Sequence, residues 1–220
     1  MLKKVSITTL SLLLSLGAST CAQAATDKSS PTNMEFGNKG ITAVEVKNLH
    51  HSGKLLVKKI KVTDSTIING SFEAIDSQFN KETVINGNMD AKTSNFNNLD
   101  VNGNVKLKTV VVNGPTAING KVEADDSEFK NTLNICGSLD AKDSKFAKMI
   151  TLKCSKETDF ENSKVQDINI KKSSDGSAQK VILKNSSVNN ITFESGDGIV
   201  EQDDKSTISG KVTGAKVEKK

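Results

Sequence analysis

The tripeptide Ile-Asn-Gly recurs in this chain at a nearly constant distance, and this period limits what the chain can fold into. It stands at residues 68–70, 85–87 and 118–120, and close variants stand at 101–103 and 135–137. The five glycines therefore recur with a period of about 17 residues. A segment that short cannot bury a core of its own, but it can form one coil of a solenoid that stacks on its neighbours.

Apolar residues recur at fixed offsets from each glycine and predict short β-strands. Offsets two and four are apolar and the residue between them is mostly charged, which is the alternation of a strand with one buried face. At offset nine, phenylalanines recur and predict a column of stacked rings that is interrupted by Val112. The residues predicted to point inward at these three offsets are Leu55, Phe72, Met89, Val105, Val122 and Leu139; Val57, Ala74, Ala91, Leu107, Ala124 and Ala141; and Val62, Phe79, Phe96, Val112, Phe129 and Phe146.

The predicted fold is all-β: a single-stranded parallel β-helix, or β-solenoid, with coils of about 17 residues. No stretch shows the 3.6-residue stripe of an amphipathic helix. Left-handed hexapeptide solenoids need coils in multiples of six, and the period here is not such a multiple, which favours a right-handed solenoid. Asn-Gly tolerates the positive φ angles of tight bends. The asparagines either form a hydrogen-bonded ladder along the axis or merely suit the bend; they are Asn69, Asn86, Asn102 and Asn119.

The repeat also predicts the organisation of the chain. A Ser-x-apolar signature continues the pattern to residues 206–208, which places the solenoid at 41–213 with nine or ten coils. Two late copies of one pattern, starting at Val165 and Val188, lie farther apart than one period, and the polar segment 171–180 between them is predicted to be a loop insertion. Residues 25–40 are expected to form a flexible leader and 214–220 a charged tail.

The N-terminus has the pattern of a secretory signal peptide. Lys3 and Lys4 precede an apolar stretch from Val5 to about Leu16, and Ala-Gln-Ala at 22–24 predicts cleavage after residue 24. The apolar stretch is shorter than the roughly 20 residues that span a bilayer. A lipoprotein cysteine at Cys21 is the alternative, although residues 18–20 match a lipobox poorly.

Export leaves two cysteines, Cys136 and Cys154, whose separation exceeds one period by a single residue. Positions one period apart lie over one another at roughly 4.8 Å, within the Cα separation that a disulfide tolerates. An even number of cysteines in an oxidising compartment favours a disulfide between Cys136 and Cys154. The alternative is that both remain reduced thiols.

Composition argues against several kinds of partner. Removing residues 1–24 takes away two of the 30 lysines and none of the 26 acidic residues, which leaves a net charge near +2. The chain contains no Arg, Trp or Tyr, so it lacks the bidentate fork for phosphate and the usual rings that stack on bases or sugars. We therefore expect no nucleic-acid partner and no small-molecule substrate.

No group of residues predicts catalysis, a metal or a cofactor. Adjacent side chains of a strand face opposite ways, so His50 and His51 cannot easily hold one metal together. A calcium-binding repeat would need an aspartate at the same offset in successive coils, but the column at offset three contains Lys106. Acidic doublets at 125–126 and 203–204 leave calcium possible at loops. A polysaccharide-cleaving site would need clustered carboxylates.

Ice binding would need a continuous ladder of threonines along one face. The candidate ladder is interrupted, and its members would be Thr66, Thr83 and Thr116.

The unit Ile-Asn-Gly-x-apolar-x-Ala, from Gly53 to Leu152, resembles the bactofilins, which are polymer-forming bacterial proteins built as right-handed three-sided β-helices. Bactofilins are cytoplasmic, whereas this chain carries a predicted signal peptide. The chain is also similar to exported putative adhesin domains with glycine-rich β-helical coils. Neither resemblance implies an active site.

From these observations we predict an exported, non-enzymatic β-solenoid with a structural or self-assembling scaffold role in the bacterial envelope. Its location would be periplasmic, associated with the outer membrane, or extracellular. Self-association would use the ends of the solenoid. The alternative is an adhesin or binding module that recognises an envelope or cell-surface partner through a side face or the loop at 171–180.

Overall fold

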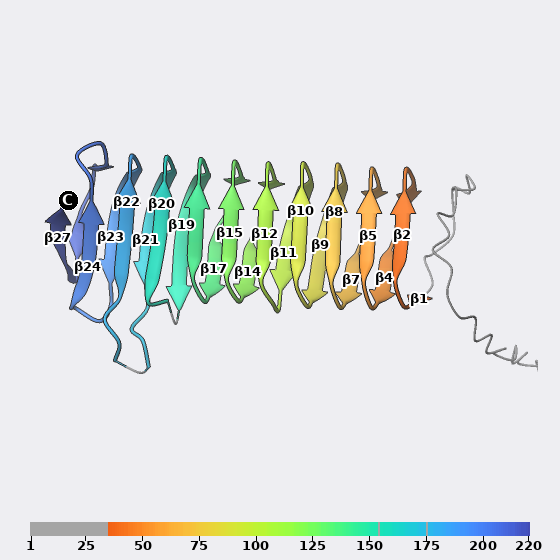
Figure 1. Ribbon diagram of the computed structural model, residues 1–220, viewed down its shortest axis with the longest axis horizontal. Helices are drawn as coiled ribbons and strands as arrows, with labels where there is room; N and C mark the ends of the chain where they lie inside the picture. Colours follow the sequence, from red (N-terminus) through yellow and green to blue (C-terminus); the bar gives the residue numbers. More distant parts are fainter. Residues whose placement is uncertain (1–34, 154, 175) are drawn as a thin grey trace, which may run out of the picture.

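The computed structural model describes residues 35–153, 155–174 and 176–220, and every regular element in these ranges is a β-strand (Figure 1). The strands form a rod in which each strand pairs in parallel with the strands one sequence period before and after it. The predicted β-solenoid is therefore confirmed. It has 11 turns, because every turn contributes one strand to an 11-stranded sheet.

The first sheet covers one side of the rod and contributes one strand per turn. Its strands, in spatial order, are β2 (Lys39–Thr42), β5 (Leu55–Lys58), β8 (Phe72–Ile75), β10 (Met89–Lys92), β12 (Val105–Lys108), β15 (Val122–Asp125), β18 (Leu139–Lys142), β20 (Glu157–Glu161), β22 (Lys180–Lys184), β24 (Gly198–Gln202) and β27 (Ala215–Lys219).

The second sheet has 16 strands and covers the other two sides of the rod, because several turns cross both sides as separate short strands that pair with one long strand of a neighbouring turn. Its strands are β1 (Glu35–Phe36), β3 (Glu45–Val46), β4 (Leu49–Ser52), β6 (Lys61–Val62), β7 (Thr66–Asn69), β9 (Gln78–Asn86), β11 (Asn95–Val101), β13 (Val111–Val112), β14 (Thr116–Asn119), β16 (Glu128–Phe129), β17 (Leu133–Cys136), β19 (Lys145–Lys153), β21 (Lys164–Ile170), β23 (Ser187–Phe193), β25 (Thr207–Ile208) and β26 (Val212–Thr213).

Figure 1 also gives the sense of the coil. The strands of the 11-stranded sheet lie nearer the viewer and run upward, while the chain advances from right to left. This combination is a right-handed coil, as the length of the sequence period predicts.

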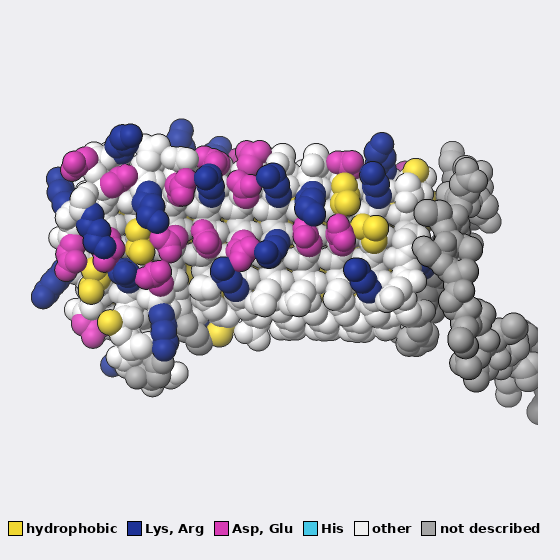
Figure 2. All heavy atoms as spheres, in the orientation of Figure 1, with side chains coloured by type: hydrophobic (Ala, Val, Ile, Leu, Met, Phe, Trp, Pro, Cys, Tyr) yellow, Lys and Arg dark blue, Asp and Glu magenta, His cyan; other side chains and the backbone are white. Residues whose placement is uncertain are grey.

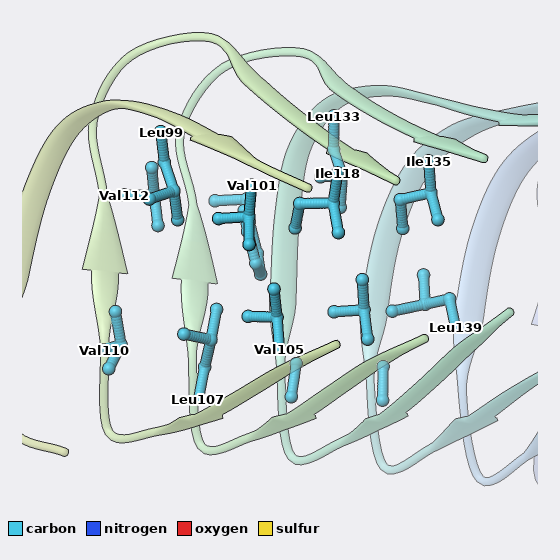
Figure 3. Packing of buried hydrophobic residues seen from close by; sticks show 14 of the residues in the cluster. Leu99, Val101, Val105, Leu107, Val110, Val112, Ile118, Leu133, Ile135 and Leu139 are labelled. Atoms are coloured by element: carbon cyan, nitrogen blue, oxygen red, sulfur yellow. The ribbon is translucent and has the colours of Figure 1, made fainter. Parts of the chain in front are cut away.

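The core consists of columns of buried side chains that run along the rod axis (Figure 3). All predicted inward positions at offsets two, four and nine are at most 3 % exposed. The aromatic column also forms as predicted. The rings of Phe79 and Phe96 stack with centroids 4.6 Å apart, and those of Phe129 and Phe146 stack at 5.1 Å, with Val112 between the two pairs.

The Asn-Gly bend is a corner where backbones approach too closely for a side chain. A Cβ on Gly87 would lie 2.1 Å from the carbonyl oxygen of Gly70 in the turn before it. The φ angle of Gly87 is +154°, a region that residues with a side chain rarely adopt. Packing and conformation together thus require glycine at Gly87, whereas at Gly103 the close approach alone requires it.

A second corner, six residues after each glycine, contains residues in the left-handed conformation. Asp76 and Asp143 suit it, but Lys59 and Thr93 adopt it as well, with φ angles of 55° and 48°. The next residue is, in most turns, the buried serine of the Ser-x-apolar signature, although Ile60 and Val110 take its place after Lys59 and Thr109. The Ser127 hydroxyl donates to the Asp125 carbonyl at 2.9 Å and accepts the Val110 amide of the preceding turn at 3.2 Å.

This arrangement repeats as a ladder of buried serines along the rod. The amide of one serine donates to the hydroxyl of the serine in the next turn, as from Ser127 to Ser144 and from Ser144 to Ser163, both at 3.1 Å. Val110 interrupts the ladder between Ser94 and Ser127. The serine therefore satisfies backbone groups that a tight corner would leave without partners. The members of the ladder are Ser77, Ser94, Ser127, Ser144, Ser163, Ser186 and Ser206.

The asparagine ladder is present for three of its four predicted members. The Asn86 amide donates to the Asn69 oxygen at 2.8 Å, and the Asn102 amide donates to the Asn86 oxygen at 3.0 Å. The asparagines thus do more than suit the bend in these turns.

The rod is longer than the predicted range of 41–213. Strands β1 and β2 lie wholly or partly within the predicted leader, and β27 lies within the predicted charged tail, where it pairs with β24. Ala215 and Val217 continue the alternation of the inward positions, which explains why this lysine-rich segment forms a strand. The described residues of the predicted loop, 171–174 and 176–179, belong to no strand. The predicted signal peptide, with Cys21, lies outside the described residues.

Candidate interaction surface

The 11-stranded sheet presents a strongly charged outer surface. Two columns of outward side chains run along it, one mainly acidic and one mainly basic, and together we call them the charged face. Figure 2 shows rows of lysines and acidic residues along this side of the rod. The charged columns contain Glu73, Asp90, Lys106, Glu123, Asp140, Asp159, Glu201 and Glu218, and beside them Lys58, Lys92, Lys108, Asp125, Lys142, Glu161 and Lys184.

Ion pairs within and between turns neutralise much of this face. Lys106 and Lys121 both contact Glu123, at 3.0 and 2.8 Å, and Lys142 contacts Glu161 at 3.0 Å. Hydrogen bonds from Lys121 and Lys106 lower the pKa of Glu123. The hydrogen bond that Lys142 donates to Glu161 raises the pKa of Lys142. Exposed pairs like these contribute little to stability, because water and salt screen them. The charged face is therefore a solvated surface on which most charges lie in ion pairs.

These shifts predict how stability depends on pH. The lowered pKa values of Glu123 and Glu201 give stability that is present above their unfolded value, about 4.3, and is lost as pH falls through the folded value. The raised pKa values of Lys121 and Lys180 give stability that is present below about 10.4 and is lost as pH rises further. Burial raises the pKa of Asp159, and this group acts in the opposite sense.

We therefore expect a plateau of stability between about pH 5 and about pH 10, with a fall on both sides. Thermal unfolding followed by circular dichroism across this range checks the prediction. A midpoint that keeps rising below pH 4 would contradict it, since the acidic side would then be governed by groups such as Asp159 rather than by the paired carboxylates.

The second half of the 16-stranded sheet presents a surface with few charges, which we call the neutral face. It consists of two outward columns, in which Asp or Lys stands, among the described strand residues, only at Asp100 and Lys153. Glu82 and Asp167 lie at the margin of this face, two residues before the first column. Ile67 is 38 % exposed there, and Val84 and Ala117 lie in the same column. The columns are His50, Ile67, Val84, Asp100, Ala117, Asn134, Thr151, Asn169, Thr192 and Thr213, and Ser52, Asn69, Asn86, Asn102, Asn119, Cys136 and Lys153.

Two open hollows lie on the neutral face. Pro115, Ala117 and Asn134 contribute to one of them, and Ala117, Asn134 and Cys136 contribute to the other. The linings are mostly amide, hydroxyl and small apolar side chains, but Glu82 and Asp100 also line the first hollow, and Asp100 and Lys153 also line the second.

The histidines and threonines singled out in the sequence do not form sites. His51 is buried in the core, 2.8 Å from the Gly37 carbonyl oxygen, while His50 faces outward beside Ser65. Thr66, Thr83 and Thr116 point inward and are at most 2 % exposed. They therefore offer no surface to ice, because their column lies in the core in register with Leu99 and Leu133.

Cys136 lies at the end of β17, directly opposite Lys153 of the next turn. Cys154, the residue after Lys153, lies outside the described residues. The disulfide between Cys136 and Cys154 therefore stays a prediction, and the register of Cys136 with Lys153 accounts for the one extra residue in their spacing.

Within the described ranges, no group of three or more His, Cys, Asp or Glu side chains is placed to hold a metal ion. Over the same residues, there is no helix with the length and apolarity needed to cross a membrane. No protein-family model, curated protein or solved structure matches this chain in the comparisons.

Proposed function

We propose that this chain is an exported, non-enzymatic β-solenoid that serves in the bacterial envelope as a rigid binding module, with the neutral face as its contact surface. The observation that carries the proposal is the contrast between the two sides of the rod. One side is covered with paired ions, whereas the other exposes amides, hydroxyls and a few aliphatic side chains over most of its length.

Physical chemistry favours the neutral side for binding. The centres of protein interfaces are depleted of charged residues, because charges must lose water before they can make contact. Ile67, Val84 and Ala117 add apolar area to this face, and Asn134 and Thr151 offer hydrogen bonds. A partner with an uncharged contact surface suits this side of the rod.

The proposal can be tested with two pairs of lysine substitutions. Ala117→Lys with Asn134→Lys places charges on the neutral face, and Leu56→Lys with Ile182→Lys places the same number on the charged face. All four side chains point outward. Each variant is produced with its own N-terminus in a Gram-negative bacterium, which is then separated into cytoplasm, periplasm, outer membrane and medium.

The wild type and the charged-face variant should fractionate with the envelope, and the neutral-face variant should be released from it. Circular dichroism of each purified variant shows whether the solenoid is still folded. Retention of a folded neutral-face variant at the wild-type level would count against this contact surface. Finding the wild type only in the cytoplasm would overturn export.

A self-assembling scaffold is the second candidate function. It is supported by the resemblance to the bactofilins and by partly exposed core residues at both ends of the rod, such as Ile41 and Val212. It requires the ends of two copies to join, so the sizes of the particles distinguish it from a module that acts singly.

A further inference from the structure

Asparagine followed by glycine is prone to deamidate without an enzyme, because glycine has no side chain to obstruct its own backbone nitrogen. That nitrogen loses its proton to hydroxide and attacks the side-chain carbonyl carbon of the asparagine. A new carbon–nitrogen bond forms, the bond to the side-chain nitrogen breaks, and ammonia leaves a five-membered succinimide ring. Water then opens the ring to aspartate or isoaspartate. The chain contains five such pairs, at 69–70, 86–87, 102–103, 113–114 and 119–120.

The hydrogen bonding of the glycine amide divides these five pairs into two groups. Three of the amides donate at 3.0 Å to a carbonyl oxygen of a neighbouring turn; these bonds run from Gly70 to Asn86, from Gly114 to Asn97 and from Gly120 to Cys136. Each of these amides must leave its acceptor before its nitrogen can lose the proton and attack. Among the described residues, the amides of Gly87 and Gly103 have no such acceptor. Only these two nitrogens can therefore react without first breaking a backbone hydrogen bond.

The asparagine ladder separates these two remaining pairs. The side chain of Asn86 is held on both sides, because its amide donates to Asn69 at 2.8 Å and its oxygen accepts from the Asn102 amide at 3.0 Å. Asn102 is the last member of the ladder. Its amide donates to Asn86, but its side-chain oxygen accepts no hydrogen bond within the described ranges. The Asn102 side chain is therefore freer to turn its carbonyl carbon toward the glycine nitrogen.

The backbone of Gly103 also differs from that of the corner glycines before and after it. Gly87 and Gly120 have φ angles of +154° and +158°, whereas Gly103 lies outside the range of positive φ. Asn102 itself is exposed, so hydroxide and water reach its side chain. An available nitrogen, a side chain held on one side only and access for water thus coincide at a single pair.

We propose that Asn102 is the site at which this protein deamidates in its folded state, through the backbone nitrogen of Gly103. The product carries a carboxylate on the neutral face, two residues from Asp100 and on the same side of the chain. It also ends the hydrogen bond to Asn86, because a carboxylate accepts hydrogen bonds and donates none. This part of the neutral face thus becomes more acidic as the molecule ages. The chemistry does not depend on what the neutral face contacts.

The test compares the purified full-length protein with the same protein unfolded in guanidinium chloride, both kept in mildly alkaline buffer. Proteolytic digestion and peptide mass spectrometry at successive times give the rate at which each of the five asparagines becomes an acid. In the unfolded chain, all five should convert at similar rates, because each precedes a glycine. In the folded protein, Asn102 should convert first. The asparagines that precede the three hydrogen-bonded glycine amides should be slower than Asn102 by roughly tenfold or more.

Asn102→Ala tests the protective effect of the ladder. It removes the donor to the Asn86 oxygen and leaves that side chain held on one side only, as Asn102 is in the wild type. Asn86 should then convert several times faster than in the wild type. Asn119→Ala is the matched control, because Asn119 lies exposed in the same column and its side chain makes no hydrogen bond within the described residues. Circular dichroism shows whether both variants are folded.

Conversion of Asn102 ahead of the other four asparagines would support the proposal, as would faster conversion of Asn86 in Asn102→Ala but not in Asn119→Ala. A folded protein in which another asparagine converts first, or in which all five convert at equal rates, would overturn it. So would a folded protein that keeps Asn102 intact while the unfolded chain converts. An unchanged rate at Asn86 in folded Asn102→Ala would contradict the selection of Asn102 by the ladder.

Discussion

Gly87→Ala should destabilise the solenoid by about 3–5 kcal/mol. The added Cβ would lie 2.1 Å from the Gly70 carbonyl oxygen and 2.7 Å from its carbonyl carbon. Neither atom can move away without disturbing the hydrogen bond from the Gly70 amide to the Asn86 carbonyl. The φ angle of +154° adds strain for any residue with a side chain.

Gly176→Ala is the matched control. Gly176 also has a positive φ angle, +67°, but a Cβ there would meet nothing within 4 Å. Its replacement should therefore cost only about 1 kcal/mol, from the backbone conformation alone. Urea unfolding of both variants measures the difference. Equal losses of stability in the two variants would show that conformation, rather than the contact between turns, is the reason for glycine at the corner.

Ser127→Ala should cost about 1–3 kcal/mol, because it removes both hydrogen bonds of a buried hydroxyl. The Val110 amide loses its acceptor and the Asp125 carbonyl loses a donor, while the volume of the side chain changes little. Ser71→Ala is the control, since Ser71 is an exposed serine beside the glycine corner. Urea unfolding should leave the control within about 0.5 kcal/mol of the wild type. The serine ladder would be unnecessary for stability if Ser127→Ala behaved like the control.

The inward columns could be predicted from the sequence because two periods coincide there. Alternation within a strand selects residues such as Phe72 and Ala74, and the longer period of the coil then stacks them on Met89 and Ala91. A wrong assignment of the alternation within a strand would place polar residues in the stacked columns, so the two periods check each other. The aromatic column follows from the same agreement.

The second corner could not be predicted, because residue type hardly signals it. Lys59 and Thr93 adopt the left-handed conformation although neither favours it. Where a serine follows the corner, its hydroxyl supports it, as Ser77 does for the Ile75 carbonyl at 2.7 Å. The Ser-x-apolar signature contained this information, but its meaning depends on a contact between turns.

The neutral face was missed for a related reason. Its members belong to one surface only through the register of ten turns, and some of these turns differ in length at the corner between the two halves of the 16-stranded sheet. A shift there, between Phe96 and Asn98, keeps Val84 aligned with Asp100 although the coil is one residue shorter. Sequence offsets counted from glycine do not reveal that alignment. The lysines of β27 likewise indicated a tail, and only pairing with β24 shows that Lys219 lies in a core column.

The direction of the backbone hydrogen bonds has a mechanical consequence. In both sheets these bonds join one turn to the next and therefore run along the length of the rod. Tension applied between the two ends of the chain loads the outermost turn first, so the bonds of one turn break before those of the next are stressed. Each turn released adds about 60 Å of extended chain. Such a rod resists sideways bending as a continuous sheet, yet under a pull along its axis it lengthens in nearly equal steps, one turn at a time.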